Sequence, residues 1–146
     1  MSDPLYSKAL LRLAADAHGA GRLTSPDVSG LAYNPACGDK VVVDLFLSDG
    51  QIIAFAHDTK ACVLAQASAS ILGANLKGAN IVTVERLLAR VTDMLESGPA
   101  PGPPFDAYSA FSGAVEYTSR HRCVLLPIEA VLDALQKTQR VAKNTA

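Results

Sequence analysis

The stretch Asn34-Pro35-Ala36-Cys37-Gly38-Asp39 carries the side chains of this chain that are best suited to metal chemistry. It places a thiol and a carboxylate two residues apart, on either side of a glycine and just after a proline. Proline restricts its own φ angle and biases the preceding residue toward extended geometry, whereas glycine reaches conformations that strain other residues. We therefore expect a tight loop that holds Cys37 and Asp39 in set directions. A cysteine sulfur and an aspartate oxygen supply half of a tetrahedral metal site.

Two further cysteines, Cys62 and Cys123, bring the chain to three thiols. Each is expected at the start of a helix, where the positive end of the helix dipole favours thiolate over thiol. If both helix starts and the loop meet at one end of a sheet, three sulfurs and the Asp39 oxygen converge. Spacing alone leaves a second interpretation open, because free cysteine is often buried and behaves as a small hydrophobic residue.

The elements that would position these residues follow from hydrophobic periodicity and from turn signals. The clearest is a hairpin at Ser48-Asp49-Gly50, in which Val41, Val43, Leu45 and Leu47 alternate with Asp44 and Ser48 on the opposite side. Before the hairpin we expect a helix begun by Ser2-Asp3-Pro4 and ended by Gly19 and Gly21, a mobile loop over 22–30 and a short strand over 31–33. The hairpin strands are expected over 40–48 and 51–58, followed by a helix from Cys62 that is stopped by Gly73 and Asn75. The remaining expected elements are a helix over 81–95, a short helix over 105–117, and a last helix from near Cys123 to about Arg140 with Pro127 in its first turn.

This order of helix, strands and then helices predicts an α+β fold, with a small antiparallel sheet and helices packed on one face. We expect a single domain over residues 1–146, because the chain is long enough to bury one core. The Pro/Gly-rich segment over 98–106 is expected to be an internal connector, since it suits neither a regular helix nor a central strand.

Composition excludes several classes of function. The formal net charge of -1 and the absence of a basic tract give no electrostatic case for binding nucleic acid. No apolar run reaches the roughly 18 residues of a membrane span, and no secretory signal opens the chain. An odd number of cysteines does not suit a secreted disulfide framework, so we expect a reducing, cytoplasmic setting.

Three separate segments resemble the signatures of one family. These are Asn34 to Asp39, then Cys62 with Ala67-Ser68-Ala69-Ser70, then Arg122-Cys123 followed by Leu126-Pro127. Together they resemble the U-type iron–sulfur cluster assembly proteins, the family of IscU, SufU and the NifU N-terminal domain. The resemblance runs from the first helix to the last, and the long segment between the second and third cysteines is closer to the SufU branch.

The resemblance implies a scaffold that accepts sulfur from a cysteine desulfurase and assembles or relays a transient [2Fe-2S] cluster. If the ligand positions of the family are carried over to this sequence, the ligands of the cluster, of iron or of zinc would be Cys37, Asp39, Cys62 and Cys123. The resemblance also implies a downstream apo-protein or carrier as a second partner. The alternative is a zinc-bound sulfurtransferase partner of the desulfurase that carries no cluster. Either role is that of a scaffold or sulfur carrier rather than of a true enzyme.

Within this site we expect Asp39 to be the labile ligand, because thiophilic metals prefer sulfur to oxygen. We expect Cys123 to accept sulfur, since it heads a helix beside Arg120 and Arg122. The scaffold subgroup typically has histidine immediately before the third cysteine. Here that position is Arg122 and His121 lies one residue earlier, so His121 is left as an optional ligand during transfer.

Two histidine-based alternatives are weaker. His57 is expected to face outward from the second hairpin strand as a surface residue. A cysteine-nucleophile enzyme would need a fixed pair of cysteine and histidine, such as Cys123 and His121, together with a substrate pocket.

Overall fold

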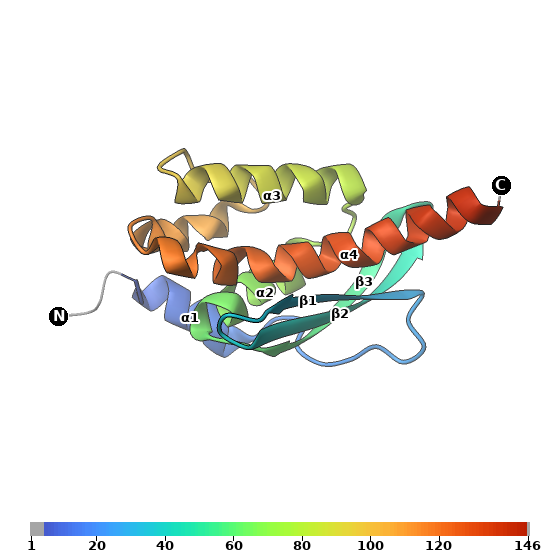
Figure 1. Cartoon of the computed structure of the whole chain (residues 1–146), viewed down its shortest axis with the longest axis horizontal. Coiled ribbons are helices and arrows are strands. Elements are labelled where there is room, and N and C mark those ends of the chain that lie inside the picture. Colours follow the sequence, from blue (N-terminus) through green and yellow to red (C-terminus); the bar gives the residue numbers. More distant parts are fainter. Residues whose placement is uncertain (1–4, 146) are drawn as a thin grey trace.

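The computed structural model describes residues 5–145, which form one α+β domain (Figure 1). Along the chain the elements are α1 Lys8–Asp16, β1 Val28–Asn34, β2 Asp39–Ser48, β3 Gln51–Lys60, α2 Val63–Asn75, α3 Ile81–Leu95, the 3₁₀ helices η1 Asp106–Ala114 and η2 Thr118–Arg120, and α4 His121–Thr145. The three strands form an antiparallel sheet in the order β1-β2-β3. The predicted fold class is therefore confirmed. In the described part of the chain, no helix has the length and apolar character needed to cross a membrane.

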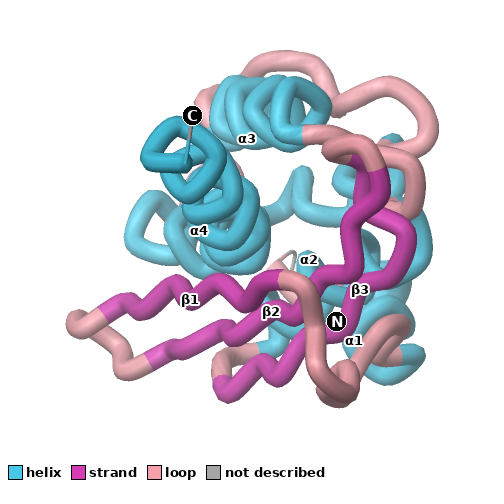
Figure 2. The backbone as a smooth tube through the Cα atoms, turned by 90° about the vertical axis from the view of Figure 1, so that its right-hand side faces the viewer, coloured by secondary structure: helices cyan, strands magenta, loops and turns pink. Residues whose placement is uncertain are grey.

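One face of the sheet packs against the helical layer (Figure 2). α4 runs over β1 and β2, α2 contacts β3, and α3 packs against α4. Val41, Val43 and Leu45 of β2 are fully buried, as their alternation predicts. β1 approaches α4 closely at Gly30, where an added Cβ would lie 2.2 Å from the carbonyl oxygen of Ala130. This contact sets the position of β1, and of the loop that follows it, relative to α4.

The opposite face of the sheet is partly covered by the segment between α1 and β1. Asp44 lies on this face, as its place in the alternation predicts, but its side chain is fully buried. The carboxylate accepts hydrogen bonds from Arg22 Nε at 2.6 Å and Nη2 at 3.1 Å, from Leu23 N at 3.1 Å and from Ser29 Oγ at 2.6 Å. The hydrogen bond from Arg22 lowers the pKa of Asp44, and the same bond raises the pKa of Arg22.

Several predicted elements are confirmed and others differ at their ends. The hairpin and the helix over 81–95 are confirmed. Residues 28–30, predicted as part of a mobile loop, instead extend β1 because they pair with residues 43–45. α2 continues past Gly73 to Asn75. Gly73 serves close packing rather than helix termination, because an added Cβ would lie 2.0 Å from the carbonyl oxygen of His18.

The two terminal helices also differ from prediction. Ser2, Asp3 and Pro4, predicted to begin the first helix, lie outside the described residues. Ser7 caps α1 by accepting a hydrogen bond from Leu10 N at 3.2 Å. α4 begins at His121, so Pro127 lies in its second turn rather than in its first. Residues 98–105 contain neither helix nor strand.

Candidate metal centre

The loop between β1 and β2 is organised by Asn34, the last residue of β1. Its carbonyl oxygen accepts hydrogen bonds from Cys37 N at 3.3 Å and from Gly38 N at 2.8 Å, and its side-chain oxygen accepts one from Ala36 N at 3.1 Å. Gly38 has a φ of 76°, a left-handed conformation that favours glycine. The predicted tight loop is confirmed, and Cys37 is exposed on it. Asn34 had no predicted role, although asparagine before proline is a known turn signal.

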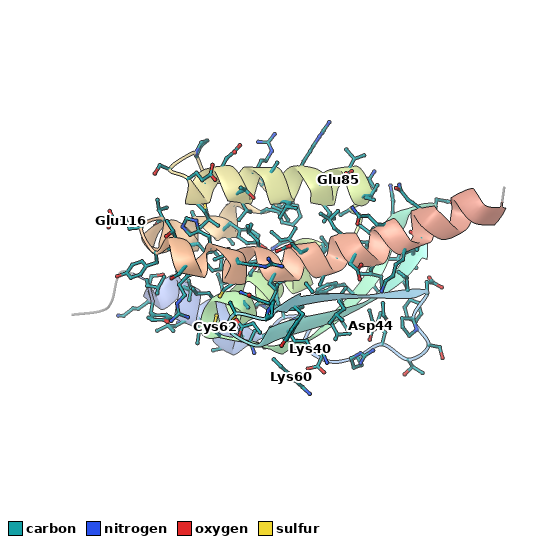
Figure 3. All side chains as sticks on the ribbon, viewed as in Figure 1. Lys40, Asp44, Lys60, Cys62, Glu85 and Glu116 are labelled. Atoms are coloured by element: carbon teal, nitrogen blue, oxygen red, sulfur yellow. The ribbon has the colours of Figure 1, made fainter. Side chains whose placement is uncertain are left out.

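Asp39 links this loop to the start of α2. It is the first residue of β2 and is only 8% exposed. One carboxylate oxygen of Asp39 lies 3.4 Å from the backbone nitrogen of Cys62, which is the N-cap residue of α2. The half-buried Cys62 side chain makes no capping bond to the helix. No capping bond therefore ties its thiol to the backbone of α2. Cys62 is labelled in Figure 3.

Cys123 brings α4 into the same region. It is the third residue of α4 and is 3% exposed. The sulfur atoms of Cys37 and Cys123 and a carboxylate oxygen of Asp39 all lie within 4.8 Å of one another. Cys62 is outside this close group, but its thiol lies near enough to Cys123 to help raise the pKa of that thiol, after burial. The structure thus brings three of the four predicted ligands together and places the fourth beside them.

The protonation of Cys123 differs from the sequence-based expectation. Burial raises its pKa to about 12, and the nearby Cys62, Asp39 and Cys37 add to the increase. The expected stabilisation of the thiolate by the helix dipole is therefore outweighed at Cys123 by loss of solvent and by neighbouring acidic groups. Arg122 does not offset this, because its guanidinium is directed to Glu129, with 4.0 Å between Nη2 and Oε2.

The chemistry of the donor set fits a thiophilic metal. Two sulfurs and one carboxylate oxygen, with a third sulfur beside them, match the ligand types of tetrahedral zinc sites and of iron bound by thiolates. Zinc–sulfur bonds of about 2.3 Å in a tetrahedron place the sulfurs about 3.8 Å apart. Atoms already within 4.8 Å of one another therefore need only a small inward movement to share one ion. A bound metal would also replace the thiol proton of Cys123, since metal binding releases protons from its ligands.

The histidines are held by other contacts. His121 Nε2 lies 3.0 Å from the carbonyl oxygens of both Ala114 and Val115, at the end of η1. Among residues 5–139, no hydrogen bond joins its ring to Cys123, so the fixed pair that a cysteine-nucleophile enzyme needs is not formed there.

The prediction that His57 faces outward is wrong. His57 pairs with Val43, so it shares the helix-facing side of the sheet and is only 2% exposed. Its ring nitrogens contact Thr59 Oγ1 at 2.8 Å and the His18 carbonyl oxygen at 3.0 Å. Burial lowers its pKa. Its role is to hold the segment after α1 against β3.

Comparisons with known proteins support the family resemblance and the fold. The sequence model of the NifU-like N-terminal domain matches residues 5–123. The iron–sulfur cluster assembly scaffold protein IscU of Thermotoga maritima is 25% identical over 136 residues, covering 93% of this chain and 96% of that protein. The crystal structure of a nitrogen-fixing NifU-like protein (N-terminal) from Brucella abortus superposes with a TM-score of 0.90 at 34% identity, covering 94% of this chain and 96% of that one.

A more distant structure shows the same fold. It is that of a putative iron–sulfur cluster assembly scaffold protein for the SUF system from Fervidobacterium islandicum AW-1. It superposes with a TM-score of 0.82 at 18% identity, covering 92% of this chain and 99% of that one.

Proposed function

This chain belongs to the NifU-like N-terminal domain family, the family of the iron–sulfur cluster assembly scaffolds, and from this premise we propose that it assembles or relays a transient [2Fe-2S] cluster at Cys37, Asp39, Cys62 and Cys123. The observation that carries the proposal is the convergence of two sulfurs and a carboxylate oxygen within 4.8 Å of one another. They come from the β1–β2 loop, from β2 and from α4, so the site exists only in the folded chain.

Asp39 is the ligand that makes the cluster transient. A carboxylate oxygen is a poorer ligand than a thiolate for a thiophilic metal, so it is the first to leave. After it leaves the metal, the carboxylate accepts a hydrogen bond from Cys62 N, which lies 3.4 Å from one of its oxygens. Replacing Asp39 with alanine should then lengthen the lifetime of a reconstituted cluster, followed by its visible absorbance under anaerobic conditions. Asp93→Ala, on the exposed face of α3, is the matched control, and faster cluster loss in Asp39→Ala than in the control would contradict this role.

The sulfur comes from a cysteine desulfurase, and Cys123 is the proposed acceptor. Its thiolate attacks the outer sulfur of the persulfide on the desulfurase, the sulfur–sulfur bond breaks, and the desulfurase cysteine leaves as a thiolate. The proton of Cys123 must leave before this attack. Because Cys123 is buried, the exposed Cys37 is the competing acceptor.

Mass spectrometry after a single turnover locates the added sulfur atom. Cys37→Ser and Cys123→Ser are compared with the wild type after mixing with the desulfurase and cysteine. The proposal expects a persulfide on Cys123 that persists in Cys37→Ser. A persulfide found only on Cys37 would assign the acceptor role to the exposed thiol instead.

The second candidate function is that of a zinc-bound sulfurtransferase partner of the desulfurase, without a cluster. It is favoured by the same donor set, because three thiolates and one carboxylate can close around a single zinc ion. Metal analysis of the purified protein, followed by anaerobic reconstitution with iron and sulfide, separates the two functions. Reddish-brown protein with absorbance in the visible range supports the scaffold. Colourless protein that keeps one zinc ion and takes up no iron supports the sulfurtransferase partner.

A further inference from the structure

One side of α3 borders a cavity away from the metal centre. Thr83, Arg86, Leu87 and Arg90 are spaced three or four residues apart, so they share one side of the helix. The opposite wall is the connector over 101–105, and the space between helix and connector is about 300 Å³. α4 lies between α3 and the sheet (Figure 2), and none of the three cysteines, all within the described chain, lines this space. We call it the connector cavity.

The connector wall is held in place at both of its ends. Where the connector begins, Gly98 N donates a hydrogen bond to Asp93 O at 2.7 Å. Where it ends, Phe105 N donates to Gly102 O at 3.0 Å, and the Phe105 side chain is only 6% exposed. The connector cavity is therefore built into the fold. Its size is at the lower end of the range for small-molecule sites, which are mostly apolar with a few polar groups.

Arg86 and Arg90 supply the positive charge of the connector cavity. They lie four residues apart on α3, where like charges on a helix repel each other. Among residues 5–139, neither guanidinium takes part in an ion pair or a hydrogen bond. The N–H donors of both groups are therefore free to bond a ligand, and an anion between them would relieve their repulsion.

Acidic residues in the adjoining segments do not occupy the connector cavity. They are Glu85 (labelled in Figure 3), Asp93, Glu96 and Asp106. Within the described chain, none of them lines the cavity and none forms an ion pair with Arg86 or Arg90. Their charges offset the attraction of distant anions. An anion is therefore recognised here by direct contact with the two arginines rather than by steering over a long range.

A second cavity of about 230 Å³ adjoins the first and shares Thr83, Pro104 and Phe105 with it. Lys77, on the turn between α2 and α3, lines this second cavity. That turn is tied to β3 by a hydrogen bond of 2.7 Å that Gly78 N donates. Two arginines thus line one cavity and a lysine lines its neighbour, so a ligand with a second anionic group has a cation available beyond the shared residues.

We propose that the connector cavity binds a small organic phosphate, with the phosphoryl group held by Arg86 and Arg90 and the carbon body against the apolar wall of the connector. A phosphoryl group carries a charge of about -1.5 to -2 at neutral pH and three acceptor oxygens. Two planar guanidinium groups can bond these oxygens in parallel, whereas a carboxylate has one charge and two oxygens.

The apolar lining indicates that the ligand is more than a free anion. Leu87, Phe105 and the three prolines of the connector offer surface that inorganic phosphate would leave unused. The proposal goes beyond the iron–sulfur function and does not rest on it, since no proposed metal ligand lines the connector cavity.

NMR titration of the full chain with phenyl phosphate, inorganic phosphate and benzoate tests this site. Phenyl phosphate should bind the wild type with a dissociation constant on the order of 1 mM and shift the amide signals of residues 83–90 and 101–105. Inorganic phosphate lacks the ring, and benzoate lacks the second charge. Each should therefore bind about fivefold or more weakly than phenyl phosphate.

Three double variants separate the arginines from the general charge of the protein. Arg86→Gln/Arg90→Gln should weaken phenyl phosphate binding about tenfold or more, because hydrogen bonds from charged groups are lost. Arg86→Lys/Arg90→Lys keeps both charges but loses the planar donors, so binding should weaken about threefold or more. The matched control is Lys8→Gln/Arg12→Gln, which removes two positive charges at the same helical spacing from exposed positions on α1 and should stay within about twofold of the wild type.

Several results would overturn the proposal. Absence of binding to the wild type, or equal binding to the two glutamine double variants, would remove the site. Signals that shift only around Cys37 and Cys62 would place the phosphate at the metal centre instead. Benzoate as tight as phenyl phosphate would make the connector cavity a carboxylate site, and inorganic phosphate as tight would remove the organic body. A phosphoserine peptide that binds far more tightly than phenyl phosphate would assign the connector cavity to a phosphorylated protein.

Discussion

Replacing Gly30 with alanine tests whether the contact of β1 with α4 sets the geometry of the metal centre. Alanine in place of glycine within a strand ordinarily gains about 0.5–1 kcal/mol. Here the added Cβ would lie 2.2 Å from Ala130 O, 2.6 Å from Ala134 N and 2.8 Å from Ala134 Cβ. None of these atoms can rotate away, because all are backbone or Cβ atoms. β1 and α4 must therefore separate by about 1 Å to restore ordinary contacts.

This separation should lower both stability and metal affinity. Overpacking of this kind lowers the free energy of unfolding by about 3 kcal/mol. Gly30→Ala should therefore destabilise the protein, although alanine is ordinarily the better strand residue. Cys37 follows β1 and Cys123 lies on α4, so the ligand atoms would also move apart. Metal–ligand distances tolerate only about 0.2 Å, and we expect a loss of tenfold or more in zinc affinity, to about the extent seen when ligands are misoriented.

Urea unfolding of the metal-free protein and competition with a chromogenic zinc chelator measure the two effects. Gly102→Ala is the matched control, because a Cβ added there meets no atom within 4 Å. A Gly30→Ala protein that is as stable as the wild type would refute the close approach of β1 to α4. A destabilised variant with unchanged zinc affinity would show that this contact does not set the metal geometry.

Three other predictions concern buried polar groups and use urea unfolding. Asp44→Asn should lower the free energy of unfolding by about 2 kcal/mol at neutral pH, because it removes the charge that Arg22 contacts at 2.6 Å. An unchanged free energy of unfolding would mean that the ion pair contributes little. Burial lowers the pKa of His57, so the contribution of neutral His57 to stability is complete above the unfolded-state pKa of about 6.5 and is lost as the pH falls below that value. His57→Gln should therefore flatten the decline in the free energy of unfolding between about pH 7 and pH 5, and an unchanged slope would contradict this. Tyr108→Phe should cost about 1 kcal/mol, because the buried hydroxyl lies 2.8 Å from Ser68 Oγ, and a stability equal to that of the wild type would show that this hydrogen bond is replaceable.

Local patterns account for the parts of the fold that were predicted well. The hairpin was predictable because its alternation and its Asp49-Gly50 turn are both encoded within a few residues. The helix over 81–95 was predictable because its apolar face repeats at helical spacing and Asn80 caps it, accepting a hydrogen bond from Thr83 N at 3.0 Å. Both elements depend on neighbours in the sequence, so no tertiary information was needed.

The predictions that were wrong concern residues whose environment depends on contacts with residues far away in the chain. His57 was expected to be exposed, but alternation along a strand gives only the face on which a side chain lies and not what covers that face. Gly73 was expected to stop a helix, whereas its lack of a side chain allows the close approach of His18, which lies just after α1. The raised pKa of Cys123 likewise depends on burial, and then on Cys62 and Asp39, which come close to it only in the folded chain.

The sequence by itself determined the chemistry that is available: three thiols and a carboxylate, the loop that presents two of these groups, and the family that the motifs around them resemble. Tertiary structure alone decided which of these groups meet and which of them is exposed. The reason is physical, because hydrogen-bonding and side-chain periodicity act over a few residues, whereas burial and convergence arise only when distant surfaces such as Gly30 and Ala130 pack together.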